Sequence, residues 1–206
     1  MGADSSLLGY PSSKGETGPP SVDQMRMPAG RRVTVPQLPL LTWQGAANDC
    51  GPHALAMASS CVLRVGPSPE RCAELLALFR VPGLGATAPI GIPVAAAKLG
   101  LRVRVGLLGL TSDLRASVDA GRPVVVLVHP SEHRRRWWAL HYRVVVGYET
   151  DEFERLSRLL LACSATPHVG ERGWNVAQTP TSFQAEWHNW MLPRWYAEIS
   201  NGQASA

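Results

Sequence analysis

The chain has 206 residues, which at roughly 100–200 residues per domain predicts one folded domain with or without a tail. Hydrophobic residues make up 45% and charged residues 17%, the composition of a globular protein. No stretch reaches the ~18 uninterrupted apolar residues of a transmembrane helix, and the first thirty residues contain no apolar run of the signal-peptide type. We therefore expect a cytoplasmic protein with no transmembrane segment.

The net charge is +4, and the basic residues are almost all arginines, which we interpret as coding bias. Nucleic-acid binding would require this charge to be clustered on one surface. The one cluster, Arg134–Arg136, runs into Trp137 and Trp138 and is typical of a solvated loop. The sequence therefore predicts no nucleic-acid partner.

Residues 1–35 are rich in Ser, Gly and Pro and show no apolar period, so they are predicted to be a disordered tail before a domain at 36–206. The domain begins with helical patterns. Ser68 and Pro69 form a typical cap and first position of a helix, and Gly100 and Gly121 are typical helix stops. The predicted helices are 50–63, 68–80, 93–99, 112–120 and 182–190.

Farther along the chain the apolar period changes from helical to extended. Residues 101–105 alternate apolar and polar side chains, which predicts a half-buried strand. Continuous β-branched or apolar runs predict strands at 123–128, 141–148 and 158–162, and a last strand is predicted at 196–199. Because helices come first and strands dominate later, we expect an α+β fold with a mostly antiparallel sheet.

Four cysteines occur in a chain without a secretion signal, so we expect free thiols rather than a disulfide framework. No CxxC pair is present, and the sequence predicts neither a metal site nor a cofactor. Free cysteine is among the most buried residue types, and Cys61 and Cys72 are predicted to be packing residues.

Cys50 differs from these because it stands at the start of a predicted buried, Ala-rich helix. Unpaired backbone N–H groups at a helix start favour a thiolate, which is the nucleophilic form of cysteine. Asn48 and Asp49 are available as helix caps, and Gly51 is predicted to leave room beside the sulfur for an acyl group. Gln44 lies six residues upstream, where its amide and the Cys50 backbone N–H are predicted to stabilise an oxyanion.

Acyl transfer by a thiol also needs a base, and histidine is the usual one. Six histidines compete for this role. His141 heads the rigid, Val-rich run at 141–148, and groups on rigid elements are held more accurately than groups on loops. His141 is therefore the favoured base.

Together, Gln44, Cys50 at a helix start and His141 opening a Val-rich strand that ends Gly147-Tyr148 resemble the papain-like cysteine peptidases. Within them the chain resembles the bacteriocin-processing family, which cleaves leader peptides after a double glycine, and its stand-alone relatives. The resemblance covers roughly residues 37–200. It implies a papain-like fold, a bacterial thiol protease (a hydrolase) acting on a peptide or protein substrate, Cys50 as nucleophile, His141 as base and Gln44 as oxyanion donor.

The resemblance also implies an Asp or Asn that orients His141, and here the chain departs from the family pattern. Cys163 or Ser164 stands where the carboxylate is expected, and Ser164 is our predicted third member. A Cys–His dyad and the substitutes Asn175, Asp151 and Glu149 remain open.

The missing carboxylate also leaves two further functions open, a catalytically degenerate peptide-binding module and a Cys-dependent acyltransferase or transpeptidase. The substrate, the cleavage specificity and the oligomeric state do not follow from the sequence.

Overall fold

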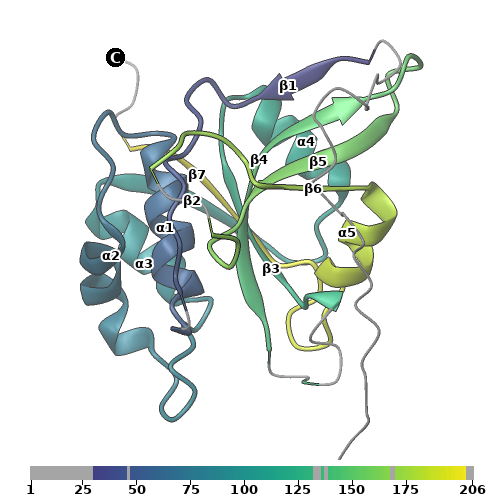
Figure 1. The fold of residues 1–206 in the computed structure, drawn as a ribbon. Helices are drawn as coiled ribbons and strands as arrows, with labels where there is room; N and C mark the ends of the chain where they lie inside the picture. Colours follow the sequence, from purple (N-terminus) through teal and green to yellow (C-terminus); the bar gives the residue numbers. More distant parts are fainter. Residues whose placement is uncertain (1–29, 46, 132–135, 137–138, 168–169, 203–206) are drawn as a thin grey trace, which may run out of the picture.

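The structure is a computed structural model that describes residues 30–45, 47–131, 136, 139–167 and 170–202 (Figure 1). Residues 1–29 of the predicted tail and most of the Arg134–Trp138 segment lie outside the described residues. The helices are α1 (Cys50–Ser60), α2 (Pro69–Leu76), α3 (Gly91–Lys98), α4 (Thr111–Asp119) and α5 (Pro180–Trp187), with a 3₁₀ turn η2 (Ala77–Phe79). The strands are β1 (Arg32–Thr34), β2 (Leu101–Gly106), β3 (Val124–Val128), β4 (His141–Thr150), β5 (Leu156–Ala162), β6 (Val176–Gln178) and β7 (Tyr196–Asn201).

The strands form one sheet in the order β2-β7-β3-β4-β5-β6, and every neighbouring pair is antiparallel. The first strand, β1, pairs with the far end of β4, where Val33 lies opposite Tyr148. Since β5 pairs with the same part of β4, β1 occupies the other edge of β4, beyond the end of β3. The predicted α+β fold with an antiparallel sheet is confirmed.

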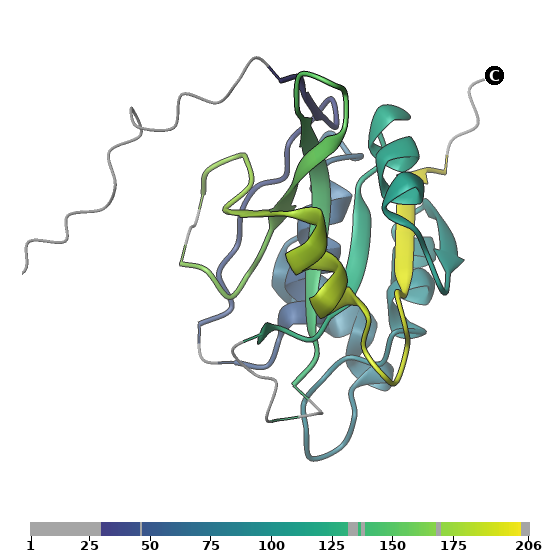
Figure 2. The same ribbon diagram turned by 90° about the vertical axis from the view of Figure 1, so that its right-hand side faces the viewer.

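Helices cover both faces of the sheet, with α1, α2 and α3 on one side and α4 and α5 on the other (Figures 1 and 2). Alternate residues of β3 and β4 therefore enter two separate cores. Val125, Leu127 and Val144 pack with α1, whereas Val124 and Val145 pack with α4 and α5. Because both faces of these strands are buried, their sequences are continuously apolar instead of alternating between apolar and polar residues.

Two strands were missed by the sequence analysis, β1 and β6, and each has only three residues. Such short strands are defined by their backbone pairing, because three residues are too few to show an apolar period. The strand β1 begins at Arg32, within the segment 1–35 that the sequence analysis assigned to the tail. None of the helices in the described part of the chain is long and apolar enough to cross a bilayer.

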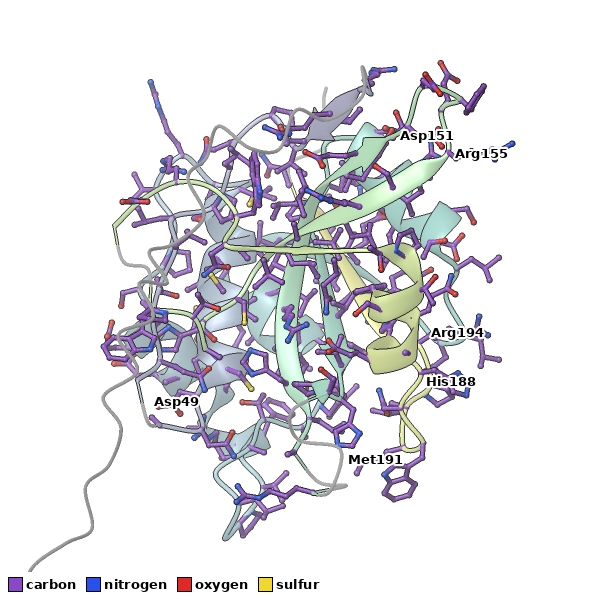
Figure 3. All side chains as sticks on the ribbon, turned by 45° about the vertical axis from the view of Figure 1, so that its right-hand side comes forward. Asp49, Asp151, Arg155, His188, Met191 and Arg194 are labelled. Atoms are coloured by element: carbon purple, nitrogen blue, oxygen red, sulfur yellow. The ribbon has the colours of Figure 1, made fainter. Side chains whose placement is uncertain are left out.

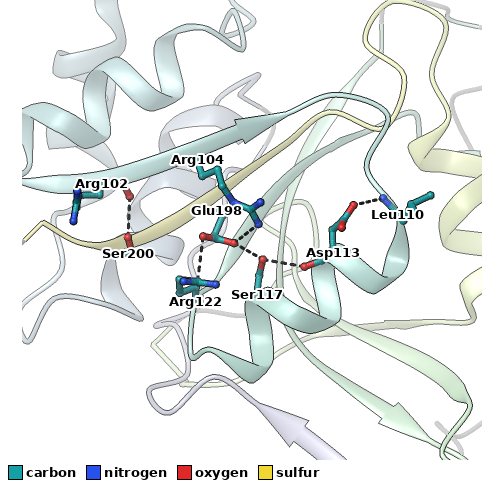
Figure 4. Close-up of polar contacts among 8 residues, drawn as sticks. All are labelled: Arg102, Arg104, Leu110, Asp113, Ser117, Arg122, Glu198 and Ser200. Atoms are coloured by element: carbon teal, nitrogen blue, oxygen red, sulfur yellow. Dashed lines mark hydrogen bonds and ion pairs between the residues drawn. The ribbon is translucent and has the colours of Figure 1, made fainter.

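A buried carboxylate joins several elements on the α4 face of the sheet (Figure 4). Glu198 on β7 forms ion pairs with Arg104 of β2 at 2.8 Å and with Arg122 at 3.1 Å. It also accepts a hydrogen bond from Ser117 of α4. Burial raises the pKa of Glu198, but these donors and the two guanidinium charges together hold it below its usual value. The contacts fix α4 and the two strands at one edge of the sheet.

Candidate active site

A pocket of about 830 Å³ opens at the end of the sheet where α1 and β4 begin. Figure 3 shows Asp49 and Met191 at this end, and Asp151 and Arg155 at the opposite end, in the β4–β5 turn. The candidate residues Gln44, Cys50, His141 and Cys163 all contribute to its wall, together with further polar residues such as Thr87 and Arg143. Its remaining wall is largely apolar and includes Val81, Leu84, Pro89, Leu127, Leu140 and Met191.

Cys50 is the first residue of α1 and its side chain is buried. Burial raises the pKa of the Cys50 thiol to about 11, although the backbone groups of Tyr142 and Gly51 act to lower it. The backbone groups at the helix start thus act in the predicted direction, but desolvation of the buried thiol outweighs them and the pKa is raised. The amide of Tyr142 follows His141 directly, so the sulfur lies beside the start of β4.

Asp49 occupies the cap position of α1, yet it makes no capping hydrogen bond among the described residues. Its carboxylate instead pairs with Arg80 at 2.6 Å. The neighbouring Asn48 donates its side-chain amide to the carbonyl of Leu84 at 2.7 Å. The two residues expected to cap the helix therefore connect its start to the loop at 80–84, which forms one wall of the pocket.

The structure requires glycine at position 51 for a different reason from the one predicted. A Cβ at this position would lie 2.4 Å from the Thr87 hydroxyl oxygen and 2.6 Å from the Thr87 Cβ. The space beside Gly51 is thus filled by the side chain of Thr87 and is not left open for an acyl group. Only glycine permits this close approach of the loop before α3 to the helix start.

His141 is buried at the start of β4, and its Nε2 lies 3.3 Å from Sγ of Cys163. Cys163 follows the last residue of β5, which pairs with β4 at Val144–Ala162. A thiol therefore contacts the imidazole at the place where the family resemblance implies an orienting carboxylate.

Ser164 lies next in the chain, but its hydroxyl donates to Oε1 of Gln44 at 2.6 Å. The same two residues are joined by a backbone hydrogen bond from the Gln44 N–H to the Ser164 carbonyl at 3.0 Å. Nε2 of Gln44 donates to the carbonyl of Ala47 at 3.0 Å. Ser164 thus contacts Gln44, the predicted oxyanion donor, and Cys163 contacts His141, the predicted base.

The other open candidates for the third member lie elsewhere. Asn175 holds the backbone of Cys163, accepting from its N–H at 2.8 Å and donating to its carbonyl at 2.8 Å. Glu149 is near the far end of β4, about 25 Å from His141 at the usual rise per strand residue, and pairs with Arg32. Asp151 accepts from backbone N–H groups within the β4–β5 turn.

The remaining histidines are separate from this group. His53 contacts the Thr42 hydroxyl at 2.9 Å, and burial lowers its pKa. Nε2 of His129 contacts the carbonyl of Arg136 at 3.1 Å, and His188 lies in the loop after α5 (Figure 3). His133 and His168 fall outside the described residues. Within the described ranges no three His, Cys, Asp or Glu side chains are grouped to hold a metal ion.

A buried ion pair beside the pocket was missed by the sequence analysis. Arg143, two residues after His141, donates to Glu186 of α5 at 2.7 Å, and both side chains are at most 7% exposed. Glu186 also accepts from Gln178 at 2.9 Å and from the Ser131 N–H at 3.0 Å. Burial acts to raise the pKa of Glu186, but these donors and the Arg143 charge hold it below its usual value. The pair joins α5 to β4 two residues after His141.

No family model matches the chain, and no curated protein matches its sequence. Solved structures do match its fold. The peptidase domain of Streptococcus ComA, described as a bi-functional ABC transporter involved in a quorum-sensing pathway, gives a TM-score of 0.57 at 22% identity, covering 79% of this chain and 98% of that one. A putative C39-like peptidase from Bacillus anthracis gives a TM-score of 0.57 at 14% identity, covering 83% and 98%.

A third match is a double glycine motif protease from an AMS/PCAT transporter, solved in complex with the leader peptide. Its TM-score is 0.51 at 12% identity, and the match covers 83% of this chain and 99% of that one. All three matches extend over nearly the whole of the peptidase domains compared. The chain therefore shares the fold of these peptidase domains, which is papain-like.

Proposed function

We propose that the protein is a cysteine peptidase that hydrolyses a peptide amide through an acyl-enzyme on Cys50. The observation that carries the proposal is the joint position of Cys50, at the start of α1, and His141, at the start of β4, in the wall of one pocket. Gln44 supplies a side-chain amide in the same wall. A nucleophile, a base and an oxyanion donor on a rigid scaffold are the parts that acyl transfer needs.

In the first half-reaction the Cys50 sulfur attacks the scissile carbonyl carbon while its proton passes to His141. Because the thiol has a pKa of about 11, the base must accept this proton as the carbon–sulfur bond forms. The oxyanion accepts hydrogen bonds from the Cys50 backbone N–H and from Gln44. One hydrogen of Nε2 is used by Ala47, which leaves the second for the oxyanion.

Collapse of this intermediate breaks the carbon–nitrogen bond, and His141 returns the proton to the leaving amine. The thioester that remains on Cys50 is then attacked by water, whose proton His141 accepts. The second collapse releases the carboxylic acid and restores the thiol. Each half-reaction thus uses the same base and the same oxyanion donors.

We further propose that the substrate is a peptide with small residues at the cleaved bond, such as a double-glycine leader peptide. Support comes from the fold of the matched peptidase domains, one of which was solved with a leader peptide. The largely apolar wall formed by the 81–89 segment, Leu140 and Met191 suits apolar side chains of an extended peptide.

The test is cleavage of synthetic peptides that carry a central Gly-Gly and apolar residues upstream, followed by mass spectrometry of the products. We expect the wild type to cut after the second glycine, and Cys50→Ala and His141→Ala to be inactive while keeping their circular-dichroism spectra. Cys72→Ala, which removes a buried thiol outside the pocket, serves as the matched control and keeps the activity.

Two results would contradict hydrolysis. Peptide binding that is unchanged in Cys50→Ala, with no turnover by the wild type, would identify a binding module. Products that carry an added amine in place of a new carboxylate would identify a transpeptidase.

A further inference from the structure

Two neighbouring residues after β5 contact two different parts of the site. Cys163 Sγ lies 3.3 Å from Nε2 of His141, and the Ser164 hydroxyl lies 2.6 Å from Oε1 of Gln44. Cys163 directly follows the last residue of β5 and Ser164 lies in the turn after it, so the two neighbouring side chains contact different elements. The β5 end thereby connects the predicted base on β4 with the predicted oxyanion donor before α1.

Hydrogen bonds to the backbone hold this dipeptide in place. Asn175 accepts from the Cys163 N–H and donates to the Cys163 carbonyl, both at 2.8 Å. The Ser164 carbonyl accepts from the Gln44 N–H at 3.0 Å, and Cys163 and Ser164 are both buried. Groups held by such surroundings keep a defined geometry, which is what a catalytic constellation needs.

We propose that Cys163 and Ser164 are the positioning residues of the site: the thiol of Cys163 orients His141, and the hydroxyl of Ser164 orients Gln44. This inference rests on the proposed peptidase function. From the sequence alone Ser164 is the predicted partner of His141, whereas the contacts give that place to Cys163 and bring Ser164 to Gln44.

The chemistry of each contact predicts what it does. When Nε2 carries the hydrogen and donates to Cys163, Nδ1 is the basic nitrogen that accepts the proton of Cys50. A neutral thiol whose sulfur accepts from Nε2 favours this tautomer but supplies no negative charge to the imidazolium that forms. The Ser164 hydroxyl donates to the carbonyl oxygen of the Gln44 amide, which turns the N–H₂ end, the end that stabilises an oxyanion, away from Ser164.

These roles predict opposite results for different substitutions at residue 163. Cys163→Ala removes the acceptor and is expected to lower kcat about tenfold, the equivalent of one hydrogen bond. Cys163→Asp restores a charged acceptor and is expected to raise kcat above the wild type. It also moves the acidic limb of the pH–rate profile to higher pH, because the carboxylate stabilises the imidazolium.

Ser164→Ala is expected to lower kcat about five- to tenfold with little change in KM, because an oxyanion contact strengthens in the transition state. Ser164→Thr keeps the hydroxyl and is expected to recover most of the loss. The pH profile of both Ser164 variants stays that of the wild type, since Ser164 does not contact the base.

The experiment compares these variants with Cys72→Ala by steady-state kinetics from pH 5 to 10, and by ¹⁵N NMR of histidine side chains. In the wild type the His141 ring is expected to show the tautomer with hydrogen on Nε2, and in Cys163→Ala a mixture of tautomers. If Cys163→Asp does not fold, Cys163→Ser takes its place and is expected to retain the wild-type tautomer.

An unchanged His141 tautomer together with unchanged kcat in Cys163→Ala would overturn the role of Cys163. Loss of activity in Ser164→Thr as complete as in Ser164→Ala would overturn the role of the Ser164 hydroxyl. The NMR readout does not depend on turnover. A wild type that cleaves no peptide but shows the expected tautomer change would therefore refute the proposed function and leave the orienting contact intact.

Discussion

The four cysteines lie in two regions of the molecule that differ in polar surroundings, although none is more than 7% exposed. Cys50 and Cys163 line the pocket, one facing backbone amides and the other facing His141. Cys61 and Cys72 are packed within α1, α2 and the turn that follows α1, and the nearest acceptor of the Cys61 thiol is the carbonyl of Met57 at 3.5 Å.

This difference teaches that burial alone does not distinguish a reactive cysteine from a packing one. Burial raises the pKa of Cys50 to about 11 and that of Cys61 and Cys72 to about 12. What separates the pocket pair is contact with a base and with N–H donors. The following predictions test that contrast.

The largest expected effect is on turnover at the nucleophile. Cys50→Ser keeps the shape of the side chain but replaces the thiol by a far less acidic hydroxyl, so we expect kcat to fall by about 10³-fold or more. Cys61→Ser is the matched change in the core and should leave kcat unchanged. If Cys61→Ser remains folded and loses as much turnover as Cys50→Ser, the distinction between pocket and core cysteines is contradicted.

The second effect is on alkylation rates. Since the pKa of the Cys50 thiol is raised to about 11, the thiol is protonated at neutral pH, and its thiolate fraction grows about tenfold per pH unit below that value. The rate at which iodoacetamide labels Cys50, measured by peptide mapping, should therefore rise about 100-fold from pH 8 to pH 10. The core cysteines should stay unlabelled in the folded protein. A Cys50 rate that is flat across this range would show that the backbone amides outweigh burial.

The third effect concerns the packing at the start of α1. Gly51→Ala forces a Cβ into the Thr87 side chain and is expected to lower the free energy of unfolding by about 1–3 kcal/mol. Thr87→Gly in the same chain removes the clash and should restore part of that loss, as urea unfolding would show. Gly173→Ala, whose Cβ meets no atom within 4 Å, is the control. A Gly51→Ala variant as stable as the control would contradict the close contact.

The smallest effect is expected in the core. Cys72→Ser places a hydroxyl at a fully buried position of α2, and about 1–2 kcal/mol of stability should be lost with kcat unchanged. Part of the loss is relieved if the hydroxyl bonds to the carbonyl one turn earlier. A change in the pH–rate profile of this variant would be inconsistent with a purely structural role.

Much of the fold was predictable because most elements carry a clear period. The starts of the Ala-rich helix at Cys50 and of the Val-rich strand at His141 were predicted correctly, since both elements are almost wholly buried. Strands β1 and β6 were not, because their three-residue lengths leave backbone pairing as the deciding interaction. Of the two irregularities in the β4–β5 ladder, one falls at Gly147, where an isolated glycine in a strand is typical of a bulge, and the other lies between Glu149 and Thr150.

In the site, residue type indicated the chemistry but not the contacts. The choice between Cys163 and Ser164 depends on which of two neighbours points toward β4, and that depends on strand register. Thr87 and Glu186 lie far from Cys50 and His141 in sequence, and only the fold brings them to Gly51 and Arg143. The effect of burial on the Cys50 thiol likewise needed the packed structure.

The most direct test of the central claim is covalent trapping of the nucleophile. The protein is incubated with a peptidyl chloromethyl ketone that ends in Gly-Gly, and intact mass and peptide mapping locate the adduct. Our account predicts one adduct per chain on Cys50, greatly slowed in His141→Ala and unaffected in Cys72→Ala. An adduct on Cys163, or labelling of Cys50 at the same rate in His141→Ala, would contradict it.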